Sequence, residues 1–414
     1  MVDYKRKVLS NGLRVISHYD DSTQMAAVNV LYDVGSRDED PHRTGFAHLF
    51  EHLMFSGSEN VEDYDIPVQK AGGENNAFTN CDMTNFYEVM PVQNIETALW
   101  LESDRMMSLN ITEKSLKIQK DVVIEEFNET CINQPYGDLW HRISGLAYKD
   151  HPYRWPTIGL EVDHIREATL TDVKNFYQQY YHPENAILVI AGNVPADQAF
   201  QMAERWFGDV PSGKKIIRKL PVESRQNDYR YQEIKAAVPA TSINLSFHIP
   251  DRRSPDFYAY DLLTDVMSNG VSSRLFHNLV KDKCLFSDID AFITGTIDPG
   301  LLVITGKLMA DVDFKVARQA LQAEIEKLKK EIISERELVM LKNKAESNLK
   351  FSEINILHKA MSLAFFEMIG DIDIINKEAE FYNNVTREDI LRIARETFRK
   401  ENCSETIYFP IERA

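Results

Sequence analysis

The chain has 414 residues, of which 43% are hydrophobic and 27% charged, and its net charge is −17 at pH 7. A single hydrophobic core stops growing at about 250–300 residues, so we expect at least two domains. The composition excludes wholesale disorder, and the acidic balance argues against a general nucleic-acid binder.

The N-terminus is charged and is followed by no apolar segment, and no later stretch approaches the ~20 apolar residues of a membrane span. We therefore expect a cytoplasmic protein, or a periplasmic one that has already been processed. The four cysteines lie far apart without a CxxC pair, which predicts neither a disulfide framework nor a thiolate zinc site. Any metal ligands are expected to be histidines and carboxylates.

In chain order, residues 13–16 and 26–32 are rich in β-branched residues between polar turns, which predicts paired strands. Helical spacing begins at about Gly45, and residues 187–192 form an apolar run typical of a buried strand. A polar, basic stretch then predicts a linker. We place an N-terminal domain at 1–212, the linker at 213–222 and a C-terminal domain at 223–414.

The two halves of the chain resemble each other. Residues 169–173 align with residues 386–390 at an offset of 217 (386 − 169), and the alignment continues without gaps. The pattern predicts a duplicated unit of about 200 residues. Each copy reads as strands, helices and a last strand, so we expect an α+β fold of two homologous domains, each a mostly antiparallel sheet packed against helices.

One helix of the first half carries a candidate metal site. His48 and His52 are spaced i,i+4 and therefore share one helix face, where one Zn²⁺ can bind both imidazoles. Glu51 projects near the same face, where a carboxylate can take a proton from metal-activated water. Such a pair also occurs by coincidence on helix surfaces, but the apolar neighbours here predict a largely buried helix, in which unpaired polar groups are costly.

Two histidines leave a catalytic zinc one protein ligand short, and a carboxylate usually completes the set. Residues 119–129 are the richest candidate segment, because this predicted helix contains three glutamates: Glu125, Glu126 and Glu129. Spacing alone does not choose among them.

Taken together, these motifs resemble those of the inverzincin zinc peptidases of family M16, which include insulysin, pitrilysin and mitochondrial processing peptidase. The resemblance is to the short bacterial members of the family in particular. The motifs that carry the resemblance cover nearly the whole chain: residues 11–15, 34–39, the HxxEH helix, 72–79, 101–106, 122–126 and 151–153. The resemblance implies one zinc ion per chain and assigns its third ligand to Glu126.

The same resemblance implies that a peptide substrate adds as an extra strand to the sheet edge beside the zinc, at Asn76, Ala77, Phe78 and Thr79. The expected reaction is endopeptidase cleavage of peptides or unfolded segments inside a clam-shell chamber. Zinc held by His48, His52 and Glu126 activates water, and Glu51 serves as the catalytic base.

The chain departs from the family pattern at three positions. Gln119 stands where many relatives carry a supporting glutamate, and Lys283 and Ser287 stand where active assemblies supply an Arg and a Tyr. Lysine lacks the planar fork of arginine, and serine is too short to replace a phenol. We therefore expect a heterodimer with a homologous partner chain that supplies the Arg/Tyr pair, with a self-sufficient homodimer as the alternative.

Two other functions stay open at this stage. One is a non-catalytic scaffold or assembly subunit of the same fold, which the joint presence of the four HxxEH-site residues disfavours. The other is a dedicated processing peptidase, which would share every site residue. Metal analysis separates the scaffold from the enzyme, whereas the natural substrate and the partner's identity cannot be read from the sequence.

Overall fold

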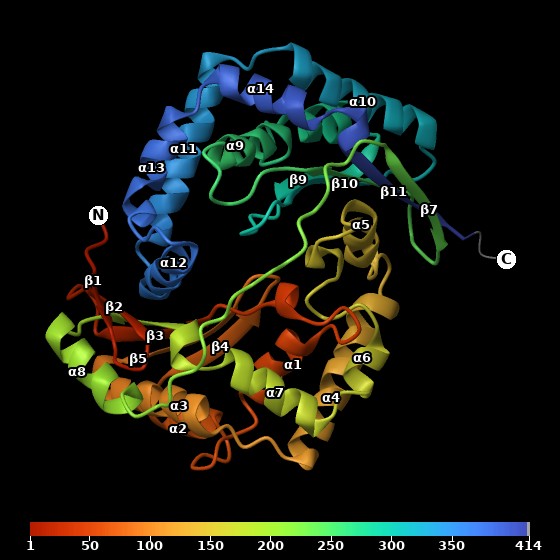
Figure 1. Ribbon diagram of the computed structural model, residues 1–414. Coiled ribbons are helices and arrows are strands. Elements are labelled where there is room, and N and C mark those ends of the chain that lie inside the picture. The colour runs from red at the N-terminus through yellow and green to blue at the C-terminus, as the bar shows by residue number, and fades with distance from the viewer. Residues whose placement is uncertain (412–414) are drawn as a thin grey trace. The chain divides into compact units, whose positions relative to one another are not determined.

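The computed structural model describes residues 1–411 and divides them into two compact units (Figure 1). Unit 1 contains residues 1–127, 155–220 and 350–377, and unit 2 contains residues 128–154, 221–349 and the chain from 378 onward. Each unit therefore includes one segment from the opposite half of the chain.

Unit 1 contains a six-stranded sheet in the order β1-β2-β6-β3-β5-β4. The strands are β1 (Lys5–Val8), β2 (Arg14–Tyr19), β3 (Met25–Tyr32), β4 (Glu74–Thr79), β5 (Thr84–Pro91) and β6 (Ala186–Gly192). β2 and β6 are parallel, and the other neighbours are antiparallel. The β-rich segments at residues 13–16 and 26–32 form β2 and β3. The predicted pairing between them was wrong, because β6 lies between these two strands. All residues of β6 are buried, and this apolar strand takes the central place between β2 and β3.

Both faces of this sheet are covered, as the alternation along β3 shows. Val28 and Val30 belong to a core shared with helices of the first half, whereas Ala27 and Leu31 point to the opposite face. The helices of the first face are α1 (Phe46–Leu53), α3 (Ile95–Ser108), α4 (Glu113–Phe127), α7 (Leu170–Tyr180) and α8 (Ala196–Phe207). The shorter α2 (Asp65–Lys70) and α6 (Val162–Arg166) complete this part of the unit.

The opposite face of the unit 1 sheet is covered by α12 (Ile356–Ile369), a helix from the second half of the chain (Figure 1). Its Ala360, Leu363 and Ala364 are buried against β3 and β6. Lys359 forms an ion pair with Asp20, which directly follows β2, so this contact fixes the helix at the end of that strand.

Unit 2 contains a five-stranded sheet in the order β7-β11-β8-β10-β9. The strands are β7 (Arg230–Ala236), β8 (Ser242–His248), β9 (Phe286–Ile293), β10 (Leu301–Leu308) and β11 (Cys403–Pro410). Within this sheet, β7 and β11 are parallel, and the other neighbouring strands that the structure describes are antiparallel. The helices from the second half are α9 (Phe257–Met267), α10 (Phe314–Lys330), α11 (Glu335–Ser352), α13 (Ile374–Asn384) and α14 (Arg387–Thr397).

The exchange of segments is reciprocal. The remaining helix of unit 2 is α5 (Leu139–Ala147) from the first half, which packs against β7, β8 and β11. It lies on the face opposite the main core of this unit, since Tyr408 bonds Asp138 just before α5, whereas the neighbouring Ile407 belongs to that core. Short 3₁₀ or π turns lie at Ser36–Asp38, Val92–Asn94, Asn128–Ile132, Pro152–Arg154, Pro183–Asn185, Phe276–Asp282 and Lys400–Asn402.

The predicted duplication is confirmed by matching elements in the two halves. Thr169 caps the start of α7 by accepting a 3.2 Å hydrogen bond from the backbone N–H of Asp172, and Thr386 caps α14 through Asp389 at 3.1 Å. Both units have the expected α+β architecture. The predicted domain limits, 1–212 and 223–414 with a linker at 213–222, describe the sequence repeats and stay a prediction. The compact units divide the chain differently, because α12 of the second half packs against the unit 1 sheet and α5 of the first half packs against the unit 2 sheet.

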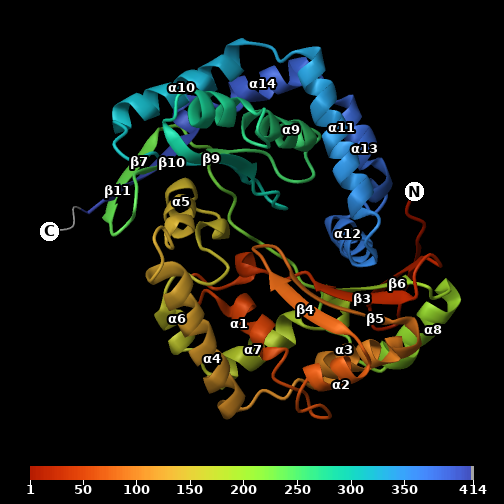
Figure 2. The same ribbon diagram turned by 180° about the vertical axis from the view of Figure 1, so that it is seen from behind.

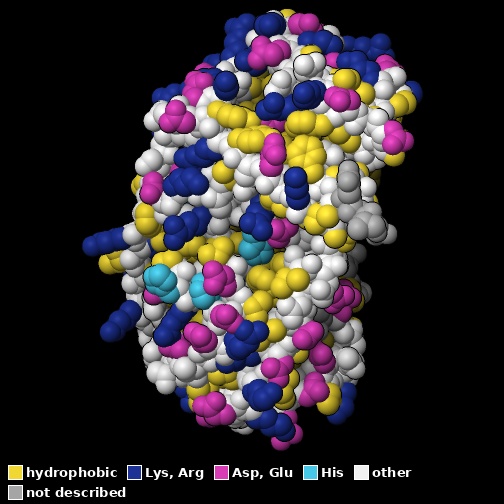
Figure 3. Space-filling view, turned by 90° about the vertical axis from the view of Figure 1, so that its right-hand side faces the viewer, with side chains coloured by type: hydrophobic (Ala, Val, Ile, Leu, Met, Phe, Trp, Pro, Cys, Tyr) yellow, Lys and Arg dark blue, Asp and Glu magenta, His cyan; other side chains and the backbone are white. Residues whose placement is uncertain are grey.

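Helix composition and surface charge add two observations. None of the helices within residues 1–411 combines the length and apolar character that crossing a bilayer demands. On the face in Figure 3, Lys and Arg side chains are interspersed with Asp and Glu.

Candidate metal centre

Helix α1 places its three polar residues on one side and buries the remainder. Phe46, Ala47, Leu49, Phe50 and Leu53 are buried in the core of unit 1. The side chains of His48, Glu51 and His52 are 15%, 18% and 25% exposed. Because His48 and His52 are one helical turn apart, their ring centroids lie only 4.9 Å from each other.

Helix α1 begins at a conformation that requires glycine. Gly45 has φ 89°, and a Cβ at this position would lie 2.8 Å from the Ile158 carbonyl oxygen. The first turn is capped from a distance, since the Glu39 carboxylate accepts hydrogen bonds from the backbone N–H groups of Gly45 at 2.9 Å and Ala47 at 2.8 Å. Burial raises the pKa of Glu39 to about 8, although these two bonds act in the opposite direction.

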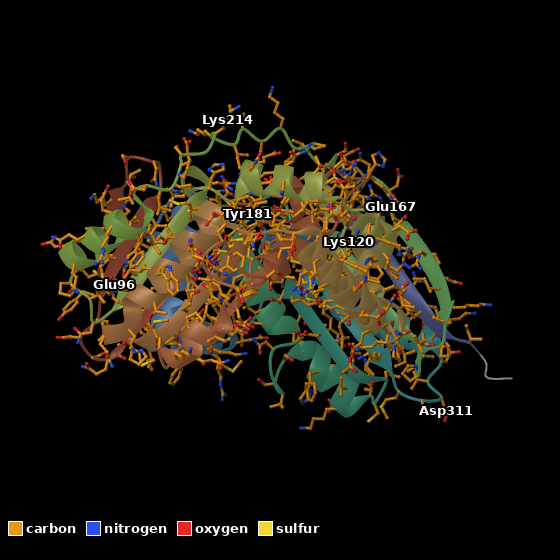
Figure 4. All side chains as sticks on the ribbon, turned by 90° about the horizontal axis from the view of Figure 1, so that it is seen from below. Glu96, Lys120, Glu167, Tyr181, Lys214 and Asp311 are labelled. Atoms are coloured by element: carbon orange, nitrogen blue, oxygen red, sulfur yellow. The ribbon has the colours of Figure 1, made fainter. Side chains whose placement is uncertain are left out.

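Aromatic packing fixes the other side of α1. The Phe50 ring stacks on Tyr181 with centroids 5.0 Å apart, and it contacts Phe176 at 5.1 Å. Tyr181 lies in the interior among the helices of unit 1 (Figure 4). The orientation of the histidine face is therefore set by buried side chains on α1 itself and on α7 and the residues after it.

Helix α4 brings a carboxylate to the two imidazoles. In its C-terminal half, Val123 belongs to the core of unit 1 and Phe127 is also buried, whereas Glu126 lies at the histidine face. Oε2 of Glu126 lies 3.1 Å from Nε2 of His48 and 3.4 Å from Nε2 of His52. Glu125 is exposed, and Glu129 lies in the turn after α4, so the other two candidate glutamates stand outside this cluster.

The geometry of these three side chains fits a tetrahedral zinc ion. One ligand atom from each of His48, His52 and Glu126 lies within 4.8 Å of the others, and among residues 1–411 this is the only such group of three. Two atoms bound at about 2.05 Å and at the tetrahedral angle would be about 3.3 Å apart, which matches the separations from Glu126. A tetrahedral ion held by these three ligands would keep a fourth position for water or substrate.

The charges of the cluster are coupled through short contacts. Burial lowers the pKa of His48, but the carboxylates of Glu126 and Glu51 outweigh this effect and raise it to about 9. Hydrogen bonds from His48 and His52 hold the pKa of Glu126 far below its usual range. A divalent ion would therefore take the place of the proton that His48 shares with Glu126.

Glu51 is held by the neighbouring sheet edge. Its Oε2 accepts a 2.6 Å hydrogen bond from the Thr79 hydroxyl and lies 3.8 Å from Nδ1 of His48. Burial alone would raise the pKa of Glu51, but these two neighbours lower it below its ordinary value. The carboxylate is consequently ionised at neutral pH and able to accept a proton.

The predicted substrate strand is part of β4, which lies at the edge of the unit 1 sheet beside α1 (Figure 2). β4 pairs only with β5, so its outer edge has no strand partner within the described residues. The backbone N–H of Ala77 donates a 2.8 Å hydrogen bond to the side-chain oxygen of Asn76.

Comparison with known proteins identifies the family. A profile described as insulinase (peptidase family M16) matches residues 14–158, and one described as peptidase M16 inactive domain matches residues 167–345. The zinc protease PqqE of Helicobacter pylori is 31% identical over 410 residues, which cover 97% of this chain and 91% of that protein. The chain belongs to peptidase family M16.

Solved structures agree with this membership of family M16. The crystal structure of a protease from Helicobacter pylori matches with a TM-score of 0.95 and 28% identity, and it covers 99% of this chain and 100% of that one. The periplasmic protease PqqL of Escherichia coli shares the fold, with a TM-score of 0.81 and 16% identity. Its match covers 99% of this chain but only 48% of the PqqL chain.

Unit 2 contains two of the three positions at which the sequence departs from the M16 pattern, Lys283 and Ser287. Lys283 Nζ lies 3.7 Å from a Glu324 carboxylate oxygen, and the Ser287 hydroxyl donates to the Lys307 carbonyl at 3.2 Å. Arg274 forms two hydrogen bonds with Glu337, at 3.0 and 2.9 Å. Each of these side chains thus already has a local partner in unit 2.

Sequence reasoning missed two contacts around the site. Glu39 was noted only within the motif at residues 34–39, and its capping of α1 joins residues that no helical or strand period relates. Thr79 was assigned to the substrate strand, whereas its hydroxyl also bonds Glu51. The sequence signal for the second contact was present in part, since a hydroxyl residue at the end of the edge strand suggests a side-chain bond there.

Proposed function

We propose that this chain is a zinc-dependent endopeptidase subunit of family M16. The observation that carries the proposal is the approach of one Glu126 oxygen to both imidazoles, at 3.1 and 3.4 Å, beside the ionised Glu51. His48, His52 and Glu126 would hold one zinc ion per chain. Two relatives described as zinc proteases, from Helicobacter pylori and Bacillus subtilis, support the choice of metal.

A bound zinc ion would supply Lewis acidity, which lowers the pKa of water and polarises a peptide carbonyl. Glu51 would accept the proton of the attacking water and return it to the leaving amine as the peptide bond breaks. Thr79 would keep the Glu51 carboxylate in one orientation while this proton moves. His48, His52 and Glu126 would take no part in the proton transfer, because they would hold the ion.

The unpaired outer edge of β4 is the observation that favours a peptide as the substrate. An extended segment could pair antiparallel with Asn76, Ala77, Phe78 and Thr79, so that main-chain hydrogen bonds place its scissile bond near Glu51. Because main-chain groups supply most of these bonds, we propose peptides and unfolded segments of varied sequence as substrates.

The proposal is tested by measuring zinc content and peptide cleavage together. We expect about one zinc per chain, with cleavage lost on chelation and restored by added zinc. Glu51→Gln should retain zinc but reduce turnover by about 1000-fold, since the proton acceptor is lost. Glu125→Gln is the matched control, because it removes the same charge from an exposed position and should leave both quantities unchanged. Near-normal turnover of Glu51→Gln would refute the proposed role of Glu51.

We further propose that a second M16 chain completes the active assembly. Lys283 and Ser287 occupy the positions at which the resemblance expects an Arg and a Tyr. The fold of PqqL supports a paired arrangement, because this chain matches only 48% of that longer protein. A homologous partner carrying the Arg/Tyr pair would supply the missing donors, and a homodimer is the alternative.

The partner proposal is tested by comparing the chain alone with a complex isolated from its native source. We expect low peptidase activity for the isolated chain and a rise when an M16 partner is added. Full activity of a homodimer, with no gain from the partner, would instead favour the self-sufficient processing peptidase. Absence of both zinc and cleavage in the native complex would favour a scaffold role.

A further inference from the structure

A cavity of about 480 Å³ opens in unit 2, away from the residues assigned to metal binding. It lies between α10 and the strands β8 and β11, and the residues after α14 close one side. Leu245, Phe247, Ile325 and Phe398 are each less than 8% exposed and form its apolar part. The volume is in the range of small-molecule sites in proteins.

In unit 1, the residues at the equivalent strand positions are packed in a closed core. The strand pairing relates Leu245, Phe247 and Cys403 to Val30, Tyr32 and Ala186 of unit 1, because Cys403 lies opposite Phe247 as Ala186 lies opposite Tyr32. These unit 1 residues belong to one closed core together with two side chains of α8: Met202 and Phe207.

The position equivalent to a core leucine is acidic in unit 2. Leu188 of unit 1 corresponds to Glu405, whose side chain is only 2% exposed and lines the cavity. Arg318 neutralises this carboxylate through two hydrogen bonds, and it also donates to the Tyr229 hydroxyl at 2.9 Å. The Glu405 charge is therefore compensated within the wall of the cavity.

The charged groups around the cavity are predominantly cationic. Four cations and two carboxylates line it, which gives a local charge of +2 (4 − 2) on a chain of net charge −17: Arg318, Lys329, Arg399, Lys400, Glu326 and Glu405.

Two of these cations retain unused donors. The hydrogen bonds of Arg318 use Nε and Nη2, and Nη1 has no partner within residues 1–411. Lys400 makes no ion pair in the described part of the chain, and its Nζ lies 5.9 Å from the Tyr229 ring centroid. Both groups are available to an anion that enters the cavity.

We propose that this cavity binds a fatty-acid-type monocarboxylate. The apolar chain would lie against Phe247, Ile325 and Phe398, and the carboxylate would meet Arg318 and Lys400. An apolar chain alone would leave the two cations without a partner, and a small inorganic anion would make no use of the apolar part of the lining. Only a ligand that combines the two properties satisfies both parts of the lining.

Calorimetric titration of the full chain with dodecanoate, below its micellar concentration, tests the proposal. We expect saturable binding of one molecule per chain, and no saturable binding of dodecyltrimethylammonium, which has the same tail with a positive head. Lys400→Gln should weaken dodecanoate binding about three- to fivefold. Lys281→Gln is the control, because Lys281 is exposed in the same unit and does not line the cavity. Equal binding of both amphiphiles, or equal affinity of both variants, would overturn the proposal.

Cysteine labelling gives a second readout on the unmodified protein. Cys403 lines the cavity and is 8% exposed, whereas Cys284 is exposed and lies outside the lining. Dodecanoate should slow alkylation of Cys403, as followed by mass spectrometry, and leave Cys284 unchanged. Unchanged labelling of Cys403 at saturating dodecanoate would contradict the proposal. The zinc-free protein should give the same results, so the outcome is independent of peptidase activity.

Discussion

The Thr79 hydroxyl donates a 2.6 Å hydrogen bond to Oε2 of Glu51, and this bond joins the edge strand β4 to the helix of the metal cluster. The residue proposed to move the proton and the strand proposed to hold the peptide are thus in direct contact. A shift of the strand would be transmitted to the carboxylate through one bond. This contact predicts that a substitution in β4 that removes the Thr79 hydroxyl also affects proton transfer by Glu51.

Replacing Thr79 by valine should lower kcat while zinc content stays normal. Valine keeps the shape of threonine but removes the donor, so the Glu51 carboxylate loses one of its two fixed neighbours. We expect a fall in kcat of about tenfold. Thr79→Ser retains the hydroxyl and should keep most of the activity. Equal kcat for the two variants would show that the hydrogen bond has no part in turnover.

Zinc affinity should distinguish two adjacent glutamates of α4. Glu126→Gln replaces a charged ligand oxygen by a neutral amide, and we expect zinc affinity to fall at least about 100-fold. Glu125→Gln makes the same change one residue earlier, on the exposed side of the helix. Competition with a coloured chelator measures both affinities. Comparable losses in the two variants would exclude Glu126 as the specific ligand.

Removal of the Glu39 carboxylate should destabilise the start of α1. In Glu39→Ala the backbone N–H groups of Gly45 and Ala47 lose their acceptor in a buried environment. We expect the free energy of unfolding to fall by about 2–3 kcal/mol in urea titrations. Glu39→Gln keeps one carbonyl acceptor and should lose less. An unchanged urea midpoint for Glu39→Ala would mean that water replaces the carboxylate.

The ion pair between Asp20 and Lys359 should stabilise unit 1 in a pH-dependent way. Hydrogen bonds from Lys359 and Ser22 lower the pKa of Asp20 to about 2, from an ordinary value of 3.8. A lowered folded-state pKa gives stability that is fully present above about pH 4 and is lost as the pH falls toward 2. Asp20→Asn should therefore cost about 1 kcal/mol at pH 7 and almost nothing at pH 2.

Thermal unfolding of wild type and Asp20→Asn across this pH range measures the difference. Arg6→Gln is the control, since Arg6 pairs with Glu367 on the same helix, but its side chain is 57% exposed. Its effect should stay below about 0.5 kcal/mol at every pH. A constant difference between wild type and Asp20→Asn from pH 7 to pH 2 would contradict the assigned titration.

The sequence was sufficient for features that depend on local spacing. The i,i+4 histidines, the adjacent Glu51 and the repeat marked by Thr169 and Thr386 all follow from short periods or a constant offset. The choice of Glu126 over its neighbours required the family resemblance, because all three glutamates share one helical stretch. The bonds of Glu39 and Thr79 join segments that are distant in sequence, and no residue pattern encodes such contacts. The same applies to β6, whose position between β2 and β3 depends on pairing across more than 150 residues.

The covering of the unit 1 sheet by α12 has a consequence for biosynthesis. On the ribosome, the first half emerges with all its strands, but 163 residues separate the end of β6 from the start of α12 (356 − 192 − 1). Until α12 is synthesised, Ala27, Leu31 and Val189 remain an exposed hydrophobic surface that is prone to aggregation. Cotranslational maturation of this half must wait for nearly the entire polypeptide, and a nascent chain stalled before α12 is a natural client for chaperones.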